Sequence, residues 1–126
     1  MYRSSKQIWL SIDNPKEKGW FLGKPLETCD SVCKRQNLIC SENEFAHHSN
    51  EQDSTDLLQD LISELGGKTS AFLCDQACAK DVPKFTEKAC IYSRCQHKSK
   101  FNCSAIPLPE KAKAQRLCYC NKEHGI

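Results

Sequence analysis

Features of several protein classes are missing from this sequence. No stretch of its 126 residues reaches the roughly 18–20 apolar residues of a membrane-spanning helix. Its 5 glycines form no phosphate-binding loop, and its formal net charge of +2 is too small for a typical nucleic-acid-binding protein. We therefore expect no membrane span, no cofactor and no nucleic-acid partner.

A catalytic or metal-binding cluster is also missing. Cys95-Gln96-His97 offers two metal ligands, but structural zinc sites usually combine two matching pairs of ligands, and no second Cys-x-His pair occurs in the sequence. The carboxylates between Glu42 and Glu64 fit the solvated face of a helix better than a pair for acid–base catalysis. We therefore predict no catalytic, cofactor-binding or metal-binding residues. The histidines lie in polar, loop-like segments and are expected at the surface: His47, His48, His97 and His124.

Cysteine is abundant. The chain has 10 cysteines, an even number, and a mean hydropathy of −0.62, which leaves little apolar material for a core. This composition favours a disulfide framework, and bridges worth about 2–4 kcal/mol each would supply most of the stability. We expect every cysteine to be oxidised: Cys29, Cys33, Cys40, Cys74, Cys78, Cys90, Cys95, Cys103, Cys118 and Cys120.

Such a framework implies an oxidising compartment, either the lumen of the secretory pathway or the extracellular space. Residues 1–14 contain no hydrophobic segment of a signal peptide, since their longest apolar run is Ile8-Trp9-Leu10. We therefore expect a piece of a longer secretory-pathway protein whose targeting segment lies upstream. Residues 1–19 are interpreted as a connector and residues 20–126 as one disulfide-stapled module.

The stretch from Trp20 to Cys40 organises this module. Thr28 or Asp30 can cap a short helix that carries Cys29 and Cys33 on one face. Their Cβ atoms would be roughly 5–6 Å apart, whereas a disulfide requires about 3.5–4.5 Å. The two cysteines are therefore expected to bond distant parts of the chain.

Two further helices follow. Ser41 and Glu44 fit a capping box that opens a short helix with Phe45 inward. Residues 52–65 form the clearest helix, which should end at Gly66-Gly67. Its expected core stripe consists of Leu57, Leu58, Leu61, Ile62 and Leu65.

The second half predicts mainly short strands. Cys74 and Cys78 have helical spacing, but Pro83 would end any helix there. Strands are expected at residues 90–92, 101–103 and 116–120, and the two cysteines of the last strand should face one side and find separate partners. The fold class is thus α+β, a small disulfide-rich module with short helices and a few short strands.

Charge is unevenly distributed. Residues 1–79 carry 8 basic and 12 acidic side chains, and residues 80–126 carry 10 and 4. The basic half could present a face to an anionic glycan or protein, or the two halves could complement each other within one domain. We favour the second interpretation.

A known family shares an ordered set of segments with this chain. They are Cys29-Asp30-Ser31-Val32-Cys33, Leu38-Ile39-Cys40, Phe45, Cys74, Val82-Pro83-Lys84-Phe85, Cys90-Ile91-Tyr92, Phe101-Asn102-Cys103-Ser104 and Gln115-Arg116-Leu117-Cys118-Tyr119-Cys120. With these segments the chain resembles the cysteine-rich C-terminal module of the α-1,6-mannosylglycoprotein β-1,6-N-acetylglucosaminyltransferases, the N-acetylglucosaminyltransferase V family (glycosyltransferase family 18). These Golgi enzymes start the β-1,6 branch of N-glycans.

The resemblance implies a structural role. In that family the nucleotide-sugar domains and the catalytic carboxylate lie upstream of the module, so no catalytic residue is carried over. The upstream catalytic domain is the expected partner, with a glycan or glycoprotein as a further one, and Trp20-Phe21-Leu22 is the expected contact. Cys78 and Cys95 are additions to the family framework and are expected to bond each other, whereas two family cysteines beyond the position of Cys120 have no counterpart.

Two alternatives remain open. A similar framework occurs as a free-standing module of other extracellular proteins, which would make this chain a binding module. The spacing Cys74-x3-Cys78-x11-Cys90-x4-Cys95 suggests an oxidised helical hairpin of the mitochondrial intermembrane space, although it leaves six cysteines unexplained. Asn102-Cys103-Ser104 is formally a glycosylation site, for which we expect little occupancy.

Overall fold

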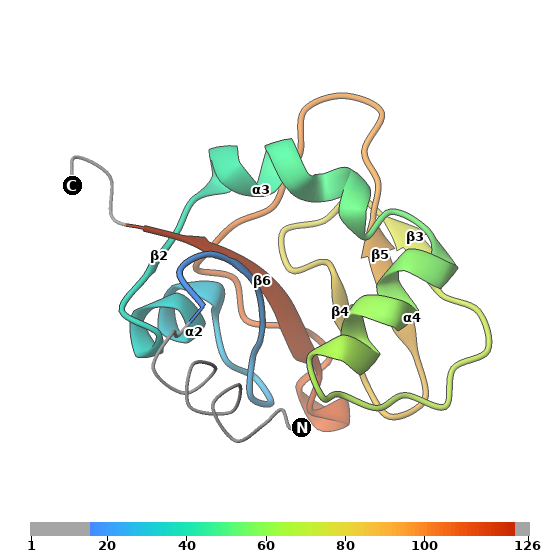
Figure 1. Cartoon of the computed structure of the whole chain (residues 1–126). Helices are drawn as coiled ribbons and strands as arrows, with labels where there is room; N and C mark the ends of the chain where they lie inside the picture. The colour runs from blue at the N-terminus through green and yellow to red at the C-terminus, as the bar shows by residue number, and fades with distance from the viewer. Residues whose placement is uncertain (1–15, 123–126) are drawn as a thin grey trace, which may run out of the picture.

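The last strand, β6, is the centre of the fold (Figure 1). The computed structural model describes residues 16–122. One edge of β6 pairs with β1, the other edge pairs with β2 and β4, and the sheet order is β1-β6-β4-β5-β3. All pairings are antiparallel except that of β3 with β5. The strands are β1 (Gly19–Leu22), β2 (Ile39–Cys40), β3 (Asp75–Ala77), β4 (Lys84–Phe85), β5 (Cys90–Ser93) and β6 (Gln115–Asn121).

The first two helices begin where the sequence predicts. Helix α2 (Cys29–Arg35) has Thr28 as its N-cap, whose hydroxyl accepts a hydrogen bond from the Ser31 amide at 3.2 Å. Helix α3 (Glu42–His48) has Ser41 as its N-cap, and Phe45 is fully buried. The structure places His47 and His48 in the last turn of α3, so their predicted loop setting was wrong. Both histidines follow Phe45 directly in the helix that Ser41 caps, and basic side chains are favourable in the last turn of a helix.

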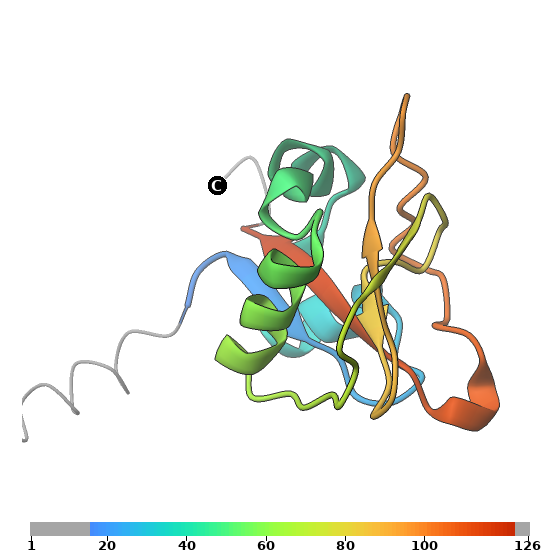
Figure 2. The same ribbon diagram turned by 90° about the vertical axis from the view of Figure 1, so that its right-hand side faces the viewer.

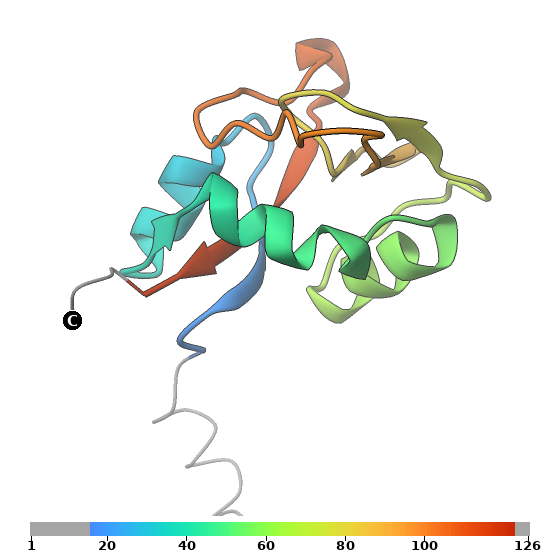
Figure 3. The ribbon, with the colours of Figure 1, turned by 90° about the horizontal axis from the view of Figure 1, so that it is seen from above.

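Helix α4 (Thr55–Glu64) follows a short 3-10 turn, η1 (Ser49–Glu51), and buries a narrower stripe than predicted. Leu58 and Ile62 are buried, whereas Leu57 is 42% exposed. The chain leaves the helix through Gly66, which adopts a φ of +89°. Figures 2 and 3 show α3 and α4 together on one side of the sheet, with the loops of residues 100–113 on the other.

Two predicted elements differ from the structure. Residues 74–78 form strand β3 with its flanks, not a helical turn, which also rules out the mitochondrial helical hairpin. Cys74 bonds Cys90, the first residue of β5, and Cys78 bonds Cys95, two residues beyond the end of β5. An extended segment is needed to reach both partners. Phe101 and Asn102 have no regular structure and a turn begins at Cys103, so the predicted strand is absent there. The backbone carbonyls of Asn102 and Ala105 instead accept hydrogen bonds from the buried side chain of Arg116 on β6.

Aromatic side chains fill the space between the sheet and the helices. The Trp20 ring makes edge-on contacts with Phe45 and Tyr119, at centroid distances of 5.8 Å and 5.4 Å, and Phe45 stacks on Phe101 at 3.9 Å. Trp20 is only 6% exposed. It therefore belongs to the core of this module and is not the partner contact that we expected.

The observed class is α+β and disulfide-rich, as predicted. The remaining regular element is a 3-10 turn, η2 (Glu110–Ala112), before β6. None of the helices in residues 16–122 has the length and apolar character to span a membrane.

Candidate binding surfaces

All ten cysteines are paired, and most of the bridges are buried. Two bridges fasten α2 to β6, so neighbouring cysteines on the helix, and on the strand, have separate partners as expected. The structure joins Cys78 to Cys95, the pairing that the resemblance led us to expect. The five bridges are Cys29–Cys118, Cys33–Cys120, Cys40–Cys103, Cys74–Cys90 and Cys78–Cys95.

One group of three potential metal ligands occurs in residues 16–122. It consists of Asp30, Cys40 and Cys103. The two sulfur atoms form a disulfide with each other at 2.04 Å, so neither is available as a thiolate. The group therefore contributes a single exposed carboxylate.

A polar network at the surface of the module surrounds Glu51, whose side chain is half exposed. Its Oε1 accepts a hydrogen bond from Trp20 Nε1 at 2.9 Å, and its Oε2 lies 2.8 Å from His48 Nδ1. The His48 ring also stacks on Tyr119 at 4.1 Å. Burial alone would raise the pKa of Glu51, but the bonds from His48 and Trp20 outweigh it and hold the pKa below its usual range. Both carboxylate oxygens are thus engaged in holding η1 against the sheet.

The other histidines lie apart from this network. His47 is exposed and lies 3.8 Å from a carboxylate oxygen of Glu44, and His97 is exposed on a loop. His124 lies outside the described residues. Among the histidines of residues 16–122, only His48 lies at hydrogen-bond distance from a second ionisable group.

Arg116 is a residue whose role the sequence did not indicate. Its side chain is fully buried and donates to the carbonyls of Asn102, Ala105 and Lys80 at 2.8, 2.9 and 3.1 Å. The guanidinium also lies 4.7 Å from the centre of the Phe101 ring. Burial lowers the pKa of Arg116 to about 10. Because all three acceptors belong to the loops, Arg116 ties those loops to β6.

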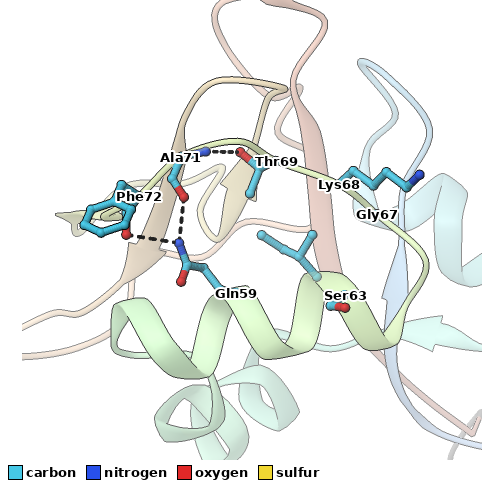
Figure 4. Close-up of a pocket in the computed structure, with 8 residues that line it drawn as sticks. Gln59, Ser63, Gly67, Lys68, Thr69, Ala71 and Phe72 are labelled. Atoms are coloured by element: carbon cyan, nitrogen blue, oxygen red, sulfur yellow. Dashed lines mark hydrogen bonds between the residues drawn. The ribbon is translucent and has the colours of Figure 1, made fainter.

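A groove of about 540 Å³ lies between α4 and the segment that follows it (Figure 4). Gln59 Nε2 crosses it to bind the carbonyls of Ala71 and Phe72 at 2.8 and 3.3 Å. Lys68 is the one charged residue in its lining, which holds neither a carboxylate nor an imidazole. This lining suits the docking of a side chain better than acid–base chemistry.

The most exposed large apolar side chains of residues 16–122 lie beside this groove. Phe72 is 91% exposed and Leu73 is 74% exposed. Their backbone is fixed, since the amide of Cys74 donates to Thr55 Oγ1 at 3.0 Å and the Cys74–Cys90 bridge follows at once. A fixed loop that presents two large apolar side chains is typical of a protein contact. We call Phe72 and Leu73 the apolar loop.

A scan against protein-family models and a search of curated proteins found no match for this chain. The five disulfides assign it to the cysteine-rich modules of the secretory pathway or the extracellular space.

Proposed function

We propose that this chain is the cysteine-rich module of a β-1,6-N-acetylglucosaminyltransferase-like protein of N-glycan branching. In this proposal the module resides in the Golgi lumen or is secreted, braces an adjoining catalytic domain and performs no sugar transfer itself. The cysteine pairing supports the proposal best. The eight cysteines shared with the family pair among themselves, and the two additions, Cys78 and Cys95, pair with each other.

The apolar loop is the contact that we propose for the catalytic domain. Burying a phenylalanine or a leucine side chain contributes about 1.5–3 kcal/mol each relative to leaving it exposed. Such anchors work best on a backbone that is already ordered, because little conformational entropy is then lost on binding. Gln59, Thr55 and the Cys74–Cys90 bridge provide that order here.

A chimeric enzyme tests the bracing role. Residues 16–122 would replace the corresponding module of a family transferase, and secretion and transfer from UDP-N-acetylglucosamine to a mannose-terminated N-glycan would be measured. We expect both to be retained, and both to fall when Phe72 and Leu73 are changed to Ser. Changing Ile106 and Leu108 to Ser is the matched control, since these are also exposed apolar residues, at 50% and 54%. A chimera no better than the transferase without its module would contradict the proposal.

Residues 1–126 alone are expected to show no transfer above the no-enzyme rate. Transfer needs a diphosphate pocket and a positioned carboxylate as general base. The carboxylate of Glu51 is engaged by Trp20 and His48, and the groove beside α4 is lined by no acid. Measurable turnover, or micromolar binding of UDP by calorimetry, would show that the module holds a site of its own.

The free-standing extracellular binding module is the second candidate. Strand β1 pairs with β6 so that Gly19 lies opposite Cys120, which places the two ends of the module side by side. A module whose two ends lie together can be attached to, or inserted into, many different proteins. Secretion of residues 16–122 as an oxidised, cooperatively folding unit that does not associate with the transferase domain would favour this candidate.

A further inference from the structure

The loop between β5 and the buried Phe101 is strongly basic. Residues 94–100 contain Arg94, His97, Lys98 and Lys100, and all four side chains are exposed. Lys80 lies beside the base of the loop, because its carbonyl accepts a hydrogen bond from the Asn102 amide at 3.0 Å. We call these five side chains the basic patch. Residues 78–80 and 94–102 contain no Asp or Glu.

The cations of the basic patch are not neutralised within the described part of the chain. The ion pairs between residues 16 and 122 involve none of the five side chains. Only one of those ion pairs, Glu17–Lys122, joins the acidic half of the chain to the basic half. The charge complementation between the two halves, which we favoured from the sequence, therefore does not extend to the basic patch. Its side chains remain available to a ligand.

The loop is fixed at its base. The Cys78–Cys95 disulfide ties it to the end of β3, and the Arg94 amide donates to the Ala77 carbonyl at 3.0 Å. At the other end Phe101 is buried, and its amide donates to Ser99 Oγ at 3.1 Å. Figures 1 and 2 show the loop projecting beyond the rest of the molecule. The charges are thus held on a prominent support, which lowers the entropy lost on binding.

A cleft of about 380 Å³ separates this loop from α3 and η1. Arg94, His97 and Lys98 line one wall, and the opposite wall includes Ser49 and Asp53. Asp53 is the one carboxylate in the lining. An anion would therefore contact the wall formed by Arg94, His97 and Lys98 and the exposed side of the loop, away from Asp53.

The rest of the charge distribution directs anions to the same place. Residues 36–67, which include α3 and α4, contain no Lys or Arg. Their acidic residues are Glu42, Glu44, Glu51, Asp53, Asp56, Asp60 and Glu64. A field polarised in this way repels an anion from the helices and attracts it to the loop.

We propose that the basic patch binds a sulfated polysaccharide. Sulfate groups are strong acceptors for the bidentate guanidinium of Arg94 and for lysine ammonium groups. A chain of repeated sulfates can contact several of the cations at once along an extended loop. Single-stranded nucleic acid is less suited, because base stacking needs an exposed aromatic ring and Phe101, at the base of the loop, is buried. The oxidising compartment implied by the five disulfides is also where sulfated glycans occur.

The test uses the full chain and a heparin decasaccharide. Calorimetry and elution from a heparin column would compare the wild type with R94Q/K98Q/K100Q. We expect binding to weaken about tenfold or more, and the wild-type affinity to fall steeply with salt as counterions are released. The matched control is K24Q/K34Q/K111Q, which removes the same charge from exposed lysines elsewhere and should change binding less than twofold.

Three results would overturn the proposal. The first is no heparin binding by the wild type at physiological salt. The second is equal weakening by the control, which would mean that only net charge matters. The third is equally tight binding of a single-stranded oligonucleotide or of chemically desulfated heparin. A C78A/C95A variant provides an independent readout. It keeps every basic side chain of the patch but frees the loop from β3, so we expect it to bind heparin several-fold more weakly than the wild type.

Discussion

At the scale of single residues, Glu27, just before α2, accepts four hydrogen bonds through its carboxylate. Arg35 donates to both of its oxygens, at 2.9 and 2.7 Å, and Ser31 Oγ and the Lys24 amide donate to them as well. These bonds, above all those from Arg35, lower the pKa of Glu27 from its usual value of 4.5 to about 2. The carboxylate thus ties the Lys24–Glu27 turn to both ends of the helix.

This arrangement predicts an acid-dependent loss of stability. Because the folded-state pKa is lowered, the contribution of Glu27 is fully present above pH 4.5 and is lost as pH falls from there toward 2. We expect E27Q to cost about 1–2 kcal/mol at pH 7, a value reduced by the partial exposure of Arg35, and to cost progressively less toward pH 2. Urea unfolding at pH 7 and pH 3 would measure this. An equal cost at both values would contradict the assignment.

Asn102 belongs to a formal glycosylation site that the fold constrains. Its Oδ1 accepts a hydrogen bond from the Ser104 amide at 2.7 Å, its carbonyl binds Arg116, and Cys103 is bonded to Cys40. We expect little glycan at Asn102 in material secreted from a eukaryotic host, because this turn becomes inaccessible once it folds. Intact-mass analysis would decide, and a nearly complete glycan adduct would count against the prediction.

At the scale of elements, β3 and β5 form a parallel pair with a bridge at each end. Cys74–Cys90 lies at the start of the pair, and Cys78–Cys95 lies just beyond its end. Two short parallel strands have few backbone hydrogen bonds, so covalent ties maintain their register. The apolar loop precedes β3, and the loop of residues 94–100, which carries most of the basic patch, follows β5. This disulfide-bonded pair of strands therefore positions both candidate binding surfaces.

Removing the second bridge should weaken the module without unfolding it. The Cys78–Cys95 bond spans a sequence separation of 17, for which the chain-entropy treatment gives about 3 kcal/mol. We expect C78A/C95A to lower the free energy of unfolding by up to that amount and to leave the far-ultraviolet circular dichroism unchanged. C33A/C120A is the comparison. It cuts a fully buried bridge between α2 and β6 and should cost more. The reverse order would mean that the β3–β5 pair, not β6, holds the fold together.

At the scale of the whole molecule, residues distant in sequence meet on β6. Its disulfides reach back 89 and 87 residues to α2, and its ladders reach β1, β2 and β4. A disulfide that closes a long loop removes more entropy from the unfolded chain than one that closes a short loop. In the chain-entropy model these two bridges therefore stabilise the fold more than Cys74–Cys90 and Cys78–Cys95 do. The module should therefore fold cooperatively, and only when oxidised.

Oxidation of the native protein can be measured directly. We expect alkylation without reduction to label no cysteine, since the structure contains no free thiol. After reduction all ten should react, and the circular dichroism of the helices should be lost. Two or more labelled thiols in the native protein would be incompatible with the five-bridge framework.

The sequence by itself determined the fold class and the residues at which helices α2 and α3 begin. The hydroxyls of Thr28 and Ser41, both proposed as caps from the sequence, cap α2 and α3 because the interaction involves residues only three apart. The start of α4 differs from the predicted residue 52, since Ser54 caps that helix and it begins at Thr55. Helical spacing excluded a Cys29–Cys33 bond, and the alternation of a strand placed Cys118 and Cys120 on one side. The cysteine count, together with the thin core, predicted an oxidised α+β module.

Only the tertiary structure decided the rest, because long-range contacts override local spacing. Cys74 and Cys78 sit four residues apart as in a helix, yet their bridges to both ends of β5 require a strand. Trp20 was predicted to be an exposed contact but is buried, since Phe45 of α3 and Tyr119 of β6 pack against its ring. The exposure of Phe72 and Leu73 follows from hydrogen bonds to a helix more than ten residues away. No local pattern contains these distances, so both candidate binding surfaces had to be found in the fold.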